Sequence, residues 1–503
     1  MKPHAPRFCL KAPQMPIRLT RTQRAFALAG ATAALLNLGA CATQDDIQPV
    51  QGRLSAQRLG LTAPEAPASA PLSDMPAWWA SLGDARLDAL VQQALQDHPN
   101  LQAAAARLRR TEAGQMRADS AASPQVQAKA EVDRQHFSAH GLYPPPIAGG
   151  YYSSGTLQLE SSWELDLFGK HRAQLDAAVG QVKAAQADVV AARWVLSTQV
   201  VRTYVQLGRL QAQRGLAERA LAQRNEMTRL VQQREKQGLD TRVEVRQSEG
   251  ALPETRNQIE ALDEQIALTR HALAVLTGQA PTALDDLQVK LDALQLPEAP
   301  AQLPLDLLSR RPDVTAALWR AQAANRTSRV TRVALFYPNI ELRSYAGYNA
   351  IGLDNLLKGS SQQWGLMPAI TLPLFDGDAR RSAMLDQVSQ EDLAIASYNQ
   401  VVQQAAQEAV DQLTSVQAVA RQQDSQRQAQ AHVEAAYDLA RSRYQAGLGN
   451  YLVVLNAETA VLAQRRAAVD LTTRALDARI GLIRAMAGGA AQAAQAATSQ
   501  PAS

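Results

Sequence analysis

An internal duplication restricts the fold of this chain more than any other feature of its sequence. Four short motifs occur twice, in the same order and 207 to 214 residues apart. The pairs are HPNLQAA at 98 with RPDVTAA at 311, SPQVQAKAEV at 123 with YPNIELRSYA at 337, ELDLFGKHR at 164 with TLPLFDGDAR at 371, and REKQGLDTRVEV at 234 with RYQAGLGNYLVV at 443. A repeat that keeps the order of four motifs indicates one structural unit used twice.

Each unit contains two segments in which polar and apolar residues alternate, the pattern of a β-strand with two unlike faces. The predicted strands are about 124–134, 155–168, 338–348 and 362–375. Their length is close to the about 9 to 11 residues that a tilted strand needs to cross a bilayer. An open four-stranded sheet would leave unpaired edge groups in lipid, so insertion requires several chains that close one barrel. Alternation alone also allows hairpins that lie on a soluble core.

Long helices follow the strands in both units. Apolar residues recur at heptad-like spacings, which favours helices packed side by side. The predicted long helices are about 171–235, 241–277, 379–445 and 450–486. The apolar positions expected to pack in the second unit include Leu385, Val388, Ile395 and Val402. At about 1.5 Å per residue the longest helices reach about 100 Å, beyond any globular core. A cytoskeletal-type coiled coil would explain the heptads but not the strands.

The first forty residues are typical of an export signal. Six basic residues, the last of them Arg24, precede an apolar stretch at 25–38, and no acidic residue occurs among them. The following LGAC resembles a bacterial lipobox, in which Cys41 would carry lipid and begin the mature chain. The apolar stretch is shorter than the about 18 residues of a membrane span. Met15 is an alternative start of translation.

Charge and cysteine content exclude several function classes. The chain has a formal charge of +4, but without the N-terminal segment it has 45 basic and 47 acidic residues, a charge of −2. No nucleic-acid-binding face is therefore expected. The two cysteines are Cys9 and Cys41. With one in the signal and the other lipidated, no thiol remains for a disulfide, a metal or catalysis, and we expect no cofactor beyond the covalent lipid.

The expected organisation has five parts. They are a lipoprotein signal peptide at 1–40, a lipidated tether at 41–76, a first repeat at 77–290, a second repeat at 291–487 and a disordered tail at 488–503. The tether is rich in Pro, Ala and Ser, and the tail has low complexity.

The sequence lacks the common motifs of catalysis and metal binding. Neither HExxH nor GxxxxGKS/T nor GxSxG occurs. His136 and His140 are four residues apart, but this spacing does not bring two side chains together in the predicted loop, so we expect no metal site. We therefore expect that the protein is not an enzyme.

The LGAC segment, the duplicated units and the motifs WELDLFGK, RPDV, LPLFDG and RYQAGLGNYLVVLNA together resemble the outer membrane factor family, the efflux ducts of the TolC/OprM type, in its lipoprotein branch. The resemblance covers about residues 75–487. It implies a mainly α fold with transmembrane β-strands, in which a homotrimer forms one 12-stranded β-barrel from four strands per protomer, continued by a long α-helical barrel in the periplasm. It also implies docking onto a periplasmic adaptor, a membrane fusion protein, and an inner-membrane pump of the resistance-nodulation-division type.

In that fold, one face of each strand contacts lipid and the other faces a water-filled lumen. The acidic side chains expected to line the lumen are Glu131, Asp133, Glu160, Glu164 and Asp166. Three copies of this charge would favour the passage of cationic or neutral solutes. The alternative is that these carboxylates only keep the lumen hydrated.

The resemblance also implies a periplasmic gate at the two helix turns. In the family the second turn presents an apolar and an acidic residue, which correspond to Leu452 and Asn456. Because Asn456 is neutral, it cannot form a carboxylate ring or an ion pair. Glu244 in the first turn corresponds to an acidic position of the family, and Arg242 or Arg246 is expected to pair with it.

Two alternatives to a passive outer-membrane duct for drugs or other small toxic compounds stay open. One is a type I secretion duct for polypeptides, and the other is a lipid-anchored envelope scaffold that transports nothing. Carboxylates on membrane-length strands favour a duct over a scaffold.

Overall fold

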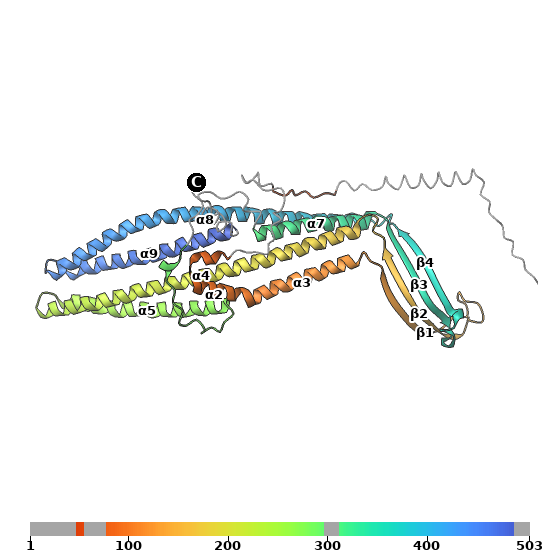
Figure 1. Cartoon of the computed structure of the whole chain (residues 1–503), viewed down its shortest axis with the longest axis horizontal. Coiled ribbons are helices and arrows are strands. Elements are labelled where there is room, and N and C mark those ends of the chain that lie inside the picture. Colours follow the sequence, from red (N-terminus) through yellow and green to blue (C-terminus); the bar gives the residue numbers. More distant parts are fainter. Residues whose placement is uncertain (1–46, 55–76, 296–310, 487–503) are drawn as a thin grey trace, which may run out of the picture.

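The structure is a computed structural model that describes residues 47–54, 77–295 and 311–486. The predicted signal peptide, Cys41, most of the predicted tether and the predicted tail lie outside the described residues. A four-stranded antiparallel sheet extends from one end of a long helical bundle (Figure 1).

The two units share the order of one helix, two strands and two long helices. The first contains η3 (Trp78–Leu82), α2 (Ala85–Asp97), α3 (Pro99–Ser120), β1 (Gln125–His136), β2 (Tyr151–Glu164), α4 (Lys170–Lys236) and α5 (Arg242–Leu276), followed by η4 (Leu291–Ala293). The second contains α7 (Pro312–Phe336), β3 (Asn339–Ile351), β4 (Gln362–Thr371), α8 (Ala379–Gln445) and α9 (Tyr451–Ala485), with short turns η5 (Leu353–Asn355) and η6 (Gly359–Ser361) between the strands. Each of α4, α5, α8 and α9 begins and ends within one residue of the bounds that the sequence predicts.

Strand β2 begins and ends four residues earlier than the sequence predicts. The alternation continues to Leu167, but the strand ends at Glu164 and the chain then turns toward α4. The Asp166 carboxylate accepts hydrogen bonds from the backbone N–H groups of His171 and Arg172, at 3.1 and 2.9 Å. Gly169 adopts φ +78°, which residues with a side chain rarely adopt. A helix start therefore replaces the end of the predicted strand.

The sheet has the order β1-β2-β3-β4, so the central β2–β3 pair joins the two units. Residues directly opposite each other place their side chains on the same face. Gln127 lies opposite Glu160, and Glu160 lies opposite Tyr345, which defines one polar face. Leu159 lies opposite Ala128 and belongs to the other, apolar face.

The sheet is not covered by helices of its own chain. Every residue of β1 is exposed, and the strands extend beyond the ends of α3, α4, α7 and α8 (Figure 1). The alternative of hairpins lying on a soluble core does not agree with this arrangement.

The helices form two long hairpins, α4 with α5 and α8 with α9, which lie side by side (Figure 1). Helix α7 packs along α4, where a Cβ atom placed on Gly180 would lie 3.1 Å from the Ala323 Cβ. Small residues at such positions permit the close approach of the two helices. Val388, Ile395 and Val402 of α8 are buried, but Leu385 is 57 % exposed in the single chain, contrary to the predicted packing.

A hydrophobic core near the middle of α4 joins η3, α2, α9 and the 284–294 segment. The rings of Trp78 and Trp194 stack with centroids 6.3 Å apart. The Tyr204 hydroxyl donates to Asp84 Oδ2 at 2.6 Å. Leu291 and Leu294 belong to this core, so the chain just after residue 290 packs with the first unit.

Among the residues that the structure describes, none of the helices combines the length and hydropathy of a membrane-spanning segment.

Candidate functional site

The polar face of the sheet is organised around Glu160. Its carboxylate accepts hydrogen bonds from the amides of Gln127 and Gln158, both at 2.8 Å. Gln363 of β4 donates to Gln158 Oε1 at 2.9 Å, so the network crosses from β1 to β4. These contacts fix the Glu160 carboxylate on the face where the sequence predicts it.

Two other predicted lumen residues, Glu131 and Asp133, also lie on this face, but their partners differ. Lys129 Nζ lies 2.8 Å from Glu131 Oε2. The Ser154 hydroxyl donates to the Asp133 carboxylate. Within the described residues neither Glu160 nor Asp133 forms an ion pair, so these two carboxylates dominate the local charge.

The polar face also carries two basic residues, Lys129 and Arg343, which the sequence-based prediction of lumen residues did not include. Arg343 Nη2 lies 2.7 Å from Glu341 Oε2, two residues away on β3. Lys129 forms the equivalent pair on β1. Side chains two residues apart on a strand share a face, so period-two alternation alone could have identified both pairs.

Glu164 and Asp166 lie at the junction between sheet and helices, at and beyond the end of β2. Lys170 Nζ lies 2.7 Å from Glu164 Oε1, and His171 Nε2 lies 3.4 Å from its other carboxylate oxygen. Asp166 lies beyond the end of β2 and accepts hydrogen bonds at the start of α4. Both carboxylates therefore connect the strand to the helix.

The opposite face of the sheet exposes large apolar side chains. Leu159 is 58 % exposed, Trp364 is 80 % exposed and Ile370 is 72 % exposed. A continuous apolar face of this kind is typical of contact with a membrane or with another protein.

The gate residues predicted at the helical tips are largely exposed in the single chain. Leu452 and Asn456 lie on the first two turns of α9. Leu452 is 50 % exposed, and Asn456 is also exposed. The single chain thus leaves both side chains accessible to a neighbouring subunit.

Glu244 does not pair with either predicted arginine. It forms a capping box, in which the Thr241 N–H donates to Glu244 Oε2 at 2.9 Å and the Thr241 hydroxyl donates to the same carboxylate. The hydrogen bond from the Thr241 hydroxyl lowers the pKa of Glu244. Arg246 Nη1 instead lies 3.0 Å from Glu249 Oε2, and Arg242 forms no ion pair within the described part of the chain.

A buried polar cluster, which sequence reasoning missed, connects the tips of the two hairpins. It consists of Arg234, Asp240 and Tyr444, and we call it the tip cluster. Arg234 Nε lies 3.1 Å from Asp240 Oδ2, and Arg234 Nη1 donates to the Tyr444 carbonyl at 3.1 Å. The Tyr444 hydroxyl donates to Asp240, and burial is the main cause that raises the pKa of Tyr444. The sequence signal that could have indicated this cluster is Arg234, the first residue of REKQGLD in the first copy of the duplicated motif.

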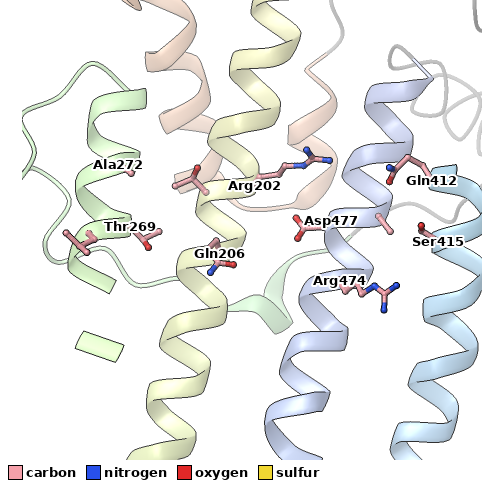
Figure 2. Close-up of a pocket in the computed structure, with 11 residues that line it drawn as sticks. Arg202, Gln206, Thr269, Ala272, Gln412, Ser415, Arg474 and Asp477 are labelled. Carbon is pink, nitrogen blue, oxygen red and sulfur yellow. The ribbon is translucent and has the colours of Figure 1, made fainter. Parts of the chain in front are cut away.

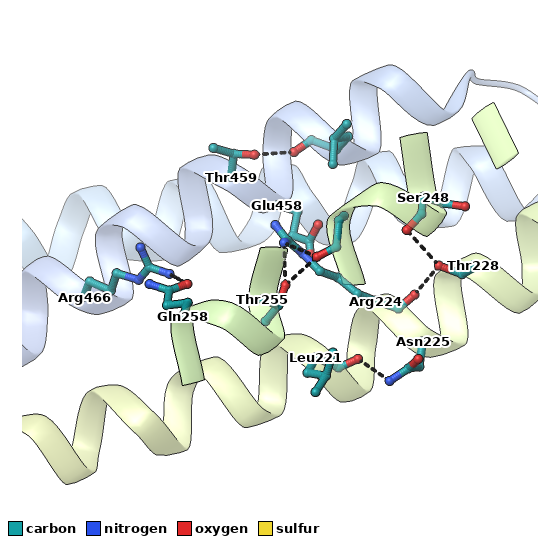
Figure 3. Close-up of polar contacts among 12 residues, drawn as sticks. Leu221, Arg224, Asn225, Thr228, Ser248, Thr255, Gln258, Glu458, Thr459 and Arg466 are labelled. Atoms are coloured by element: carbon teal, nitrogen blue, oxygen red, sulfur yellow. Dashed lines mark hydrogen bonds and ion pairs between the residues drawn. The ribbon is translucent and has the colours of Figure 1, made fainter. Parts of the chain in front are cut away.

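A second buried contact lies further along the hairpins (Figure 3). Arg224 Nε lies 3.2 Å from Glu458 Oε1, and Arg224 Nη1 donates to Thr255 Oγ1 at 2.7 Å. Burial raises the pKa of Glu458, and the Arg224 guanidinium opposes this effect. Nearby, Arg466 donates to Gln258. These contacts hold α9 against α4 and α5.

A groove of about 750 Å³ lies between α4, α5, α8 and α9 (Figure 2). Its lining combines polar and apolar surface, and its polar side chains include Arg202, Gln412, Arg474 and Asp477. Burial raises the pKa of Asp477, while the charge of Arg202 opposes the shift. The groove is open to the surface and does not include Trp78 or Trp194 of the core.

Within the described residues, no group of three His, Cys, Asp or Glu side chains is arranged to hold a metal ion. His136 Nε2 lies 3.3 Å from the Gly149 carbonyl oxygen, and the His136 ring lies 4.5 Å from the Tyr151 ring.

Comparison with known proteins agrees with the duplication. The chain matches the outer membrane efflux protein family over residues 90–279 and 303–488, one stretch in each unit. It is 31 % identical over 425 residues to the putative multidrug resistance outer membrane protein MdtQ of Escherichia coli strain K12, covering 82 % of this chain and 87 % of that protein. It is 33 % identical over 373 residues to the fusaric acid resistance protein FusA of Burkholderia cepacia, covering 72 % and 69 %.

A solved structure has the same fold over most of the chain. The outer membrane protein VceC from Vibrio cholerae matches with a TM-score of 0.77 and 33 % sequence identity, covering 82 % of this chain and 98 % of that one. The chain therefore belongs to the outer membrane efflux protein family and is an outer-membrane channel protein of an efflux system.

Proposed function

We propose that three copies of this chain form the duct of a tripartite efflux system. The trimer would have a 12-stranded barrel in the outer membrane and a helical barrel in the periplasm. The observation that carries this proposal is the sheet, which has one polar face, one exposed apolar face and two open edges. Because unpaired strand edges are costly in lipid, edge strand β1 of one copy would pair with β4 of the next. The duct performs no catalytic step.

The proposed partners are a periplasmic adaptor and an inner-membrane pump of the resistance-nodulation-division type. The proposed cargo is drugs or other small toxic compounds, in agreement with the names of the relatives MdtQ and FusA. The carboxylates of Glu160 and Asp133 would repel anions more than cations during passage.

Lipidation of Cys41 agrees with the position of the described segment 47–54, which we call the strap. The Ile47 carbonyl accepts a hydrogen bond from Arg332, near the sheet-proximal end of α7. Five residues lie between Cys41 and Ile47. The chain therefore takes six Cα–Cα steps, each of which spans at most about 3.3–3.6 Å when extended. Cys41 is therefore within about 22 Å of that position, on the side of the molecule from which the sheet extends.

The proposed gate lies at the helical tips, where Leu452 and Asn456 of three copies would narrow the tunnel. With Asn456 neutral, closure depends on contacts other than a ring of carboxylates. The tip cluster supplies such contacts, because it fixes the α8–α9 hairpin against the α4–α5 hairpin.

Purified protein in planar bilayers tests the proposal. We expect a detergent-stable trimer that forms ion-conducting pores. A deletion strain should become more susceptible to small toxic compounds, and the wild-type gene should restore resistance. A monomer without conductance, or a deletion strain with unchanged susceptibility to every compound tested, would favour the scaffold.

A further inference from the structure

The two loops at the outer end of the sheet fold across opposite faces of it. Residues 137–150 join β1 to β2, and residues 352–361 join β3 to β4. The register of the strands identifies the face that each loop covers. Because the two loops cover different faces, the first loop can have a role that the second does not share.

The first loop crosses the polar face. Tyr152 lies opposite Gln135, and both are an even number of residues from the Gln127–Glu160 pair, so their side chains share its face. The ring of Phe137 lies 6.0 Å from the ring of Tyr152. The ring of Tyr143, at the tip of the loop, lies 4.9 Å from that of Phe137. The aromatic cluster therefore sits on the side of Glu160.

Hydrogen bonds hold the loop in this position. The Tyr152 hydroxyl donates to the Pro146 carbonyl at 2.7 Å. The Phe137 N–H donates to the Gly150 carbonyl, and the Gly149 N–H donates to the Phe137 carbonyl, both at 2.9 Å. A Cβ atom on Gly150 would lie 2.6 Å from the Tyr152 ring, so the ring packs directly on the backbone. The Tyr152 contacts thus tie the loop to the polar face, and the two backbone bonds close its base.

The second loop covers the apolar face and provides an internal comparison. Gly155 lies opposite Val132, on the apolar face. A Cβ atom on Gly155 would lie 3.0 Å from Leu353 Cδ2 and 2.9 Å from Leu356 Cδ2. Both leucines therefore pack on the side that would contact lipid. Only the first loop is placed to narrow a lumen.

We propose that residues 137–150 form an aromatic collar inside the outer mouth of the duct, and that this collar limits the size of the molecules that pass. The proposal rests on the proposed function, since three copies must close a barrel. Leu142 is 99 % exposed and Tyr143 is 51 % exposed, so both side chains are free to contact a passing solute. Small apolar and aromatic solutes pass along these side chains, while bulky hydrophilic molecules are excluded.

A single thiol placed on the periplasmic side of the collar tests this proposal. A reagent added outside the cell reaches this thiol without passing the periplasmic gate. The only cysteines are Cys9 and Cys41, in the predicted signal and lipidation site. Glu160→Cys therefore places one reactive thiol on the polar face. Intact cells are treated with a small charged maleimide and with a maleimide attached to a large poly(ethylene glycol). Labelling rates report which reagent passes the outer mouth.

With the loop intact, we expect labelling of Glu160→Cys by the small reagent and little labelling by the large one. The pair Leu142→Ala and Tyr143→Ala should increase the rate for the large reagent at least about tenfold. The matched control, Leu353→Ala with Leu356→Ala on the other loop, should leave this rate unchanged. Rapid labelling by the large reagent with the loop intact, or no change in the collar variant, would overturn the collar.

Two further cysteines separate failure of the collar from failure of the duct. Leu357→Cys lies on the second loop, where Leu357 is 71 % exposed, and equal labelling there shows that each variant reaches the surface. Leu159→Cys lies on the apolar face of the sheet. If Leu159→Cys were labelled from outside while Glu160→Cys resisted even the small reagent in the collar variant, the polar face would not line an aqueous lumen, and the proposed duct itself would be wrong.

Discussion

Arg234 of the first helical hairpin donates a hydrogen bond from Nη1 to the carbonyl oxygen of Tyr444 in the second, at 3.1 Å, and its guanidinium carbon lies 4.6 Å from the centroid of the Tyr444 ring. The two residues are 210 positions apart in sequence. Asp240 completes the tip cluster by accepting from both side chains. This contact ties the tip of one hairpin to the tip of the other.

Because the tip cluster holds the two hairpins together, we expect a substitution that weakens it to open the channel. Tyr444→Phe removes the hydroxyl that donates to Asp240, a bond to a charged group worth about 1.5–3 kcal/mol. We expect higher single-channel conductance and longer open periods in planar bilayers. Arg242→Ala is the matched control, because Arg242 is exposed and forms no ion pair within the described residues. A variant Tyr444→Phe with wild-type conductance would contradict a closing role for the cluster.

How far the sequence determines this structure differs between its parts. The long helices follow from heptad spacing and from the Gly-containing turns, since Gly238 and Gly447 both adopt positive φ where the hairpins reverse. The polar and apolar faces of the sheet follow from period-two alternation. These features depend on neighbours in sequence, so local patterns are sufficient to predict them.

Contacts between the two units are harder to predict from sequence. The sequence predicts an ion pair between Glu244 and Arg242 or Arg246, but Glu244 instead forms a capping box with Thr241. Arg234 meets Tyr444 only because two hairpins from different units lie side by side. The spacing of residues within one unit predicts neither the Arg234–Tyr444 contact nor the Arg224–Glu458 ion pair.

Arg224 is the counter-ion of the buried Glu458, so its removal should destabilise the helical hairpins. Arg224→Ala leaves a buried carboxylate without its partner, and breaking a buried pair in this way costs about 3–5 kcal/mol. We expect this loss at neutral pH in denaturant unfolding of the detergent-solubilised protein. The exposed Arg246, paired with Glu249 on the surface of α5, provides the control, and Arg246→Ala should cost at most about 1 kcal/mol.

The destabilisation of Arg224→Ala should depend on pH. Folding raises the pKa of Glu458 above its ordinary value of 4.5, so its contribution to stability is present below that value and is lost as pH rises through the raised one. Without Arg224 the folded pKa rises further. The variant should therefore regain stability as pH falls toward that pKa, and adding Glu458→Gln should abolish the dependence. Equal destabilisation at acidic and neutral pH would exclude this mechanism.

The strap should be held on α8 by Asp392. Its carboxylate accepts hydrogen bonds from the N–H groups of Val50 and Gln51, at 3.2 and 2.8 Å. For Asp392→Ala we expect about tenfold faster hydrogen exchange at these two amides, equivalent to about 1.4 kcal/mol. Asp386→Ala is the control, because the Asp386 carboxylate accepts from Gln390 on the same helix. Unchanged exchange in Asp392→Ala would show that the strap is held by other contacts.

In the proposed duct, Glu160 should control the charge selectivity of the pore, because its carboxylate lies on the polar face of the sheet and has no ion-pair partner within the described residues. Glu160→Gln removes one negative charge per subunit, so we expect a lower ratio of cation to anion permeability. The reversal potential in a potassium chloride gradient measures this ratio, in the Tyr444→Phe background so that the tips limit the current less. Adding Gln158→Glu restores the charge on the same face, two residues away, and should restore the ratio. If Glu160→Gln left the reversal potential unchanged, the carboxylate would serve hydration of the lumen alone.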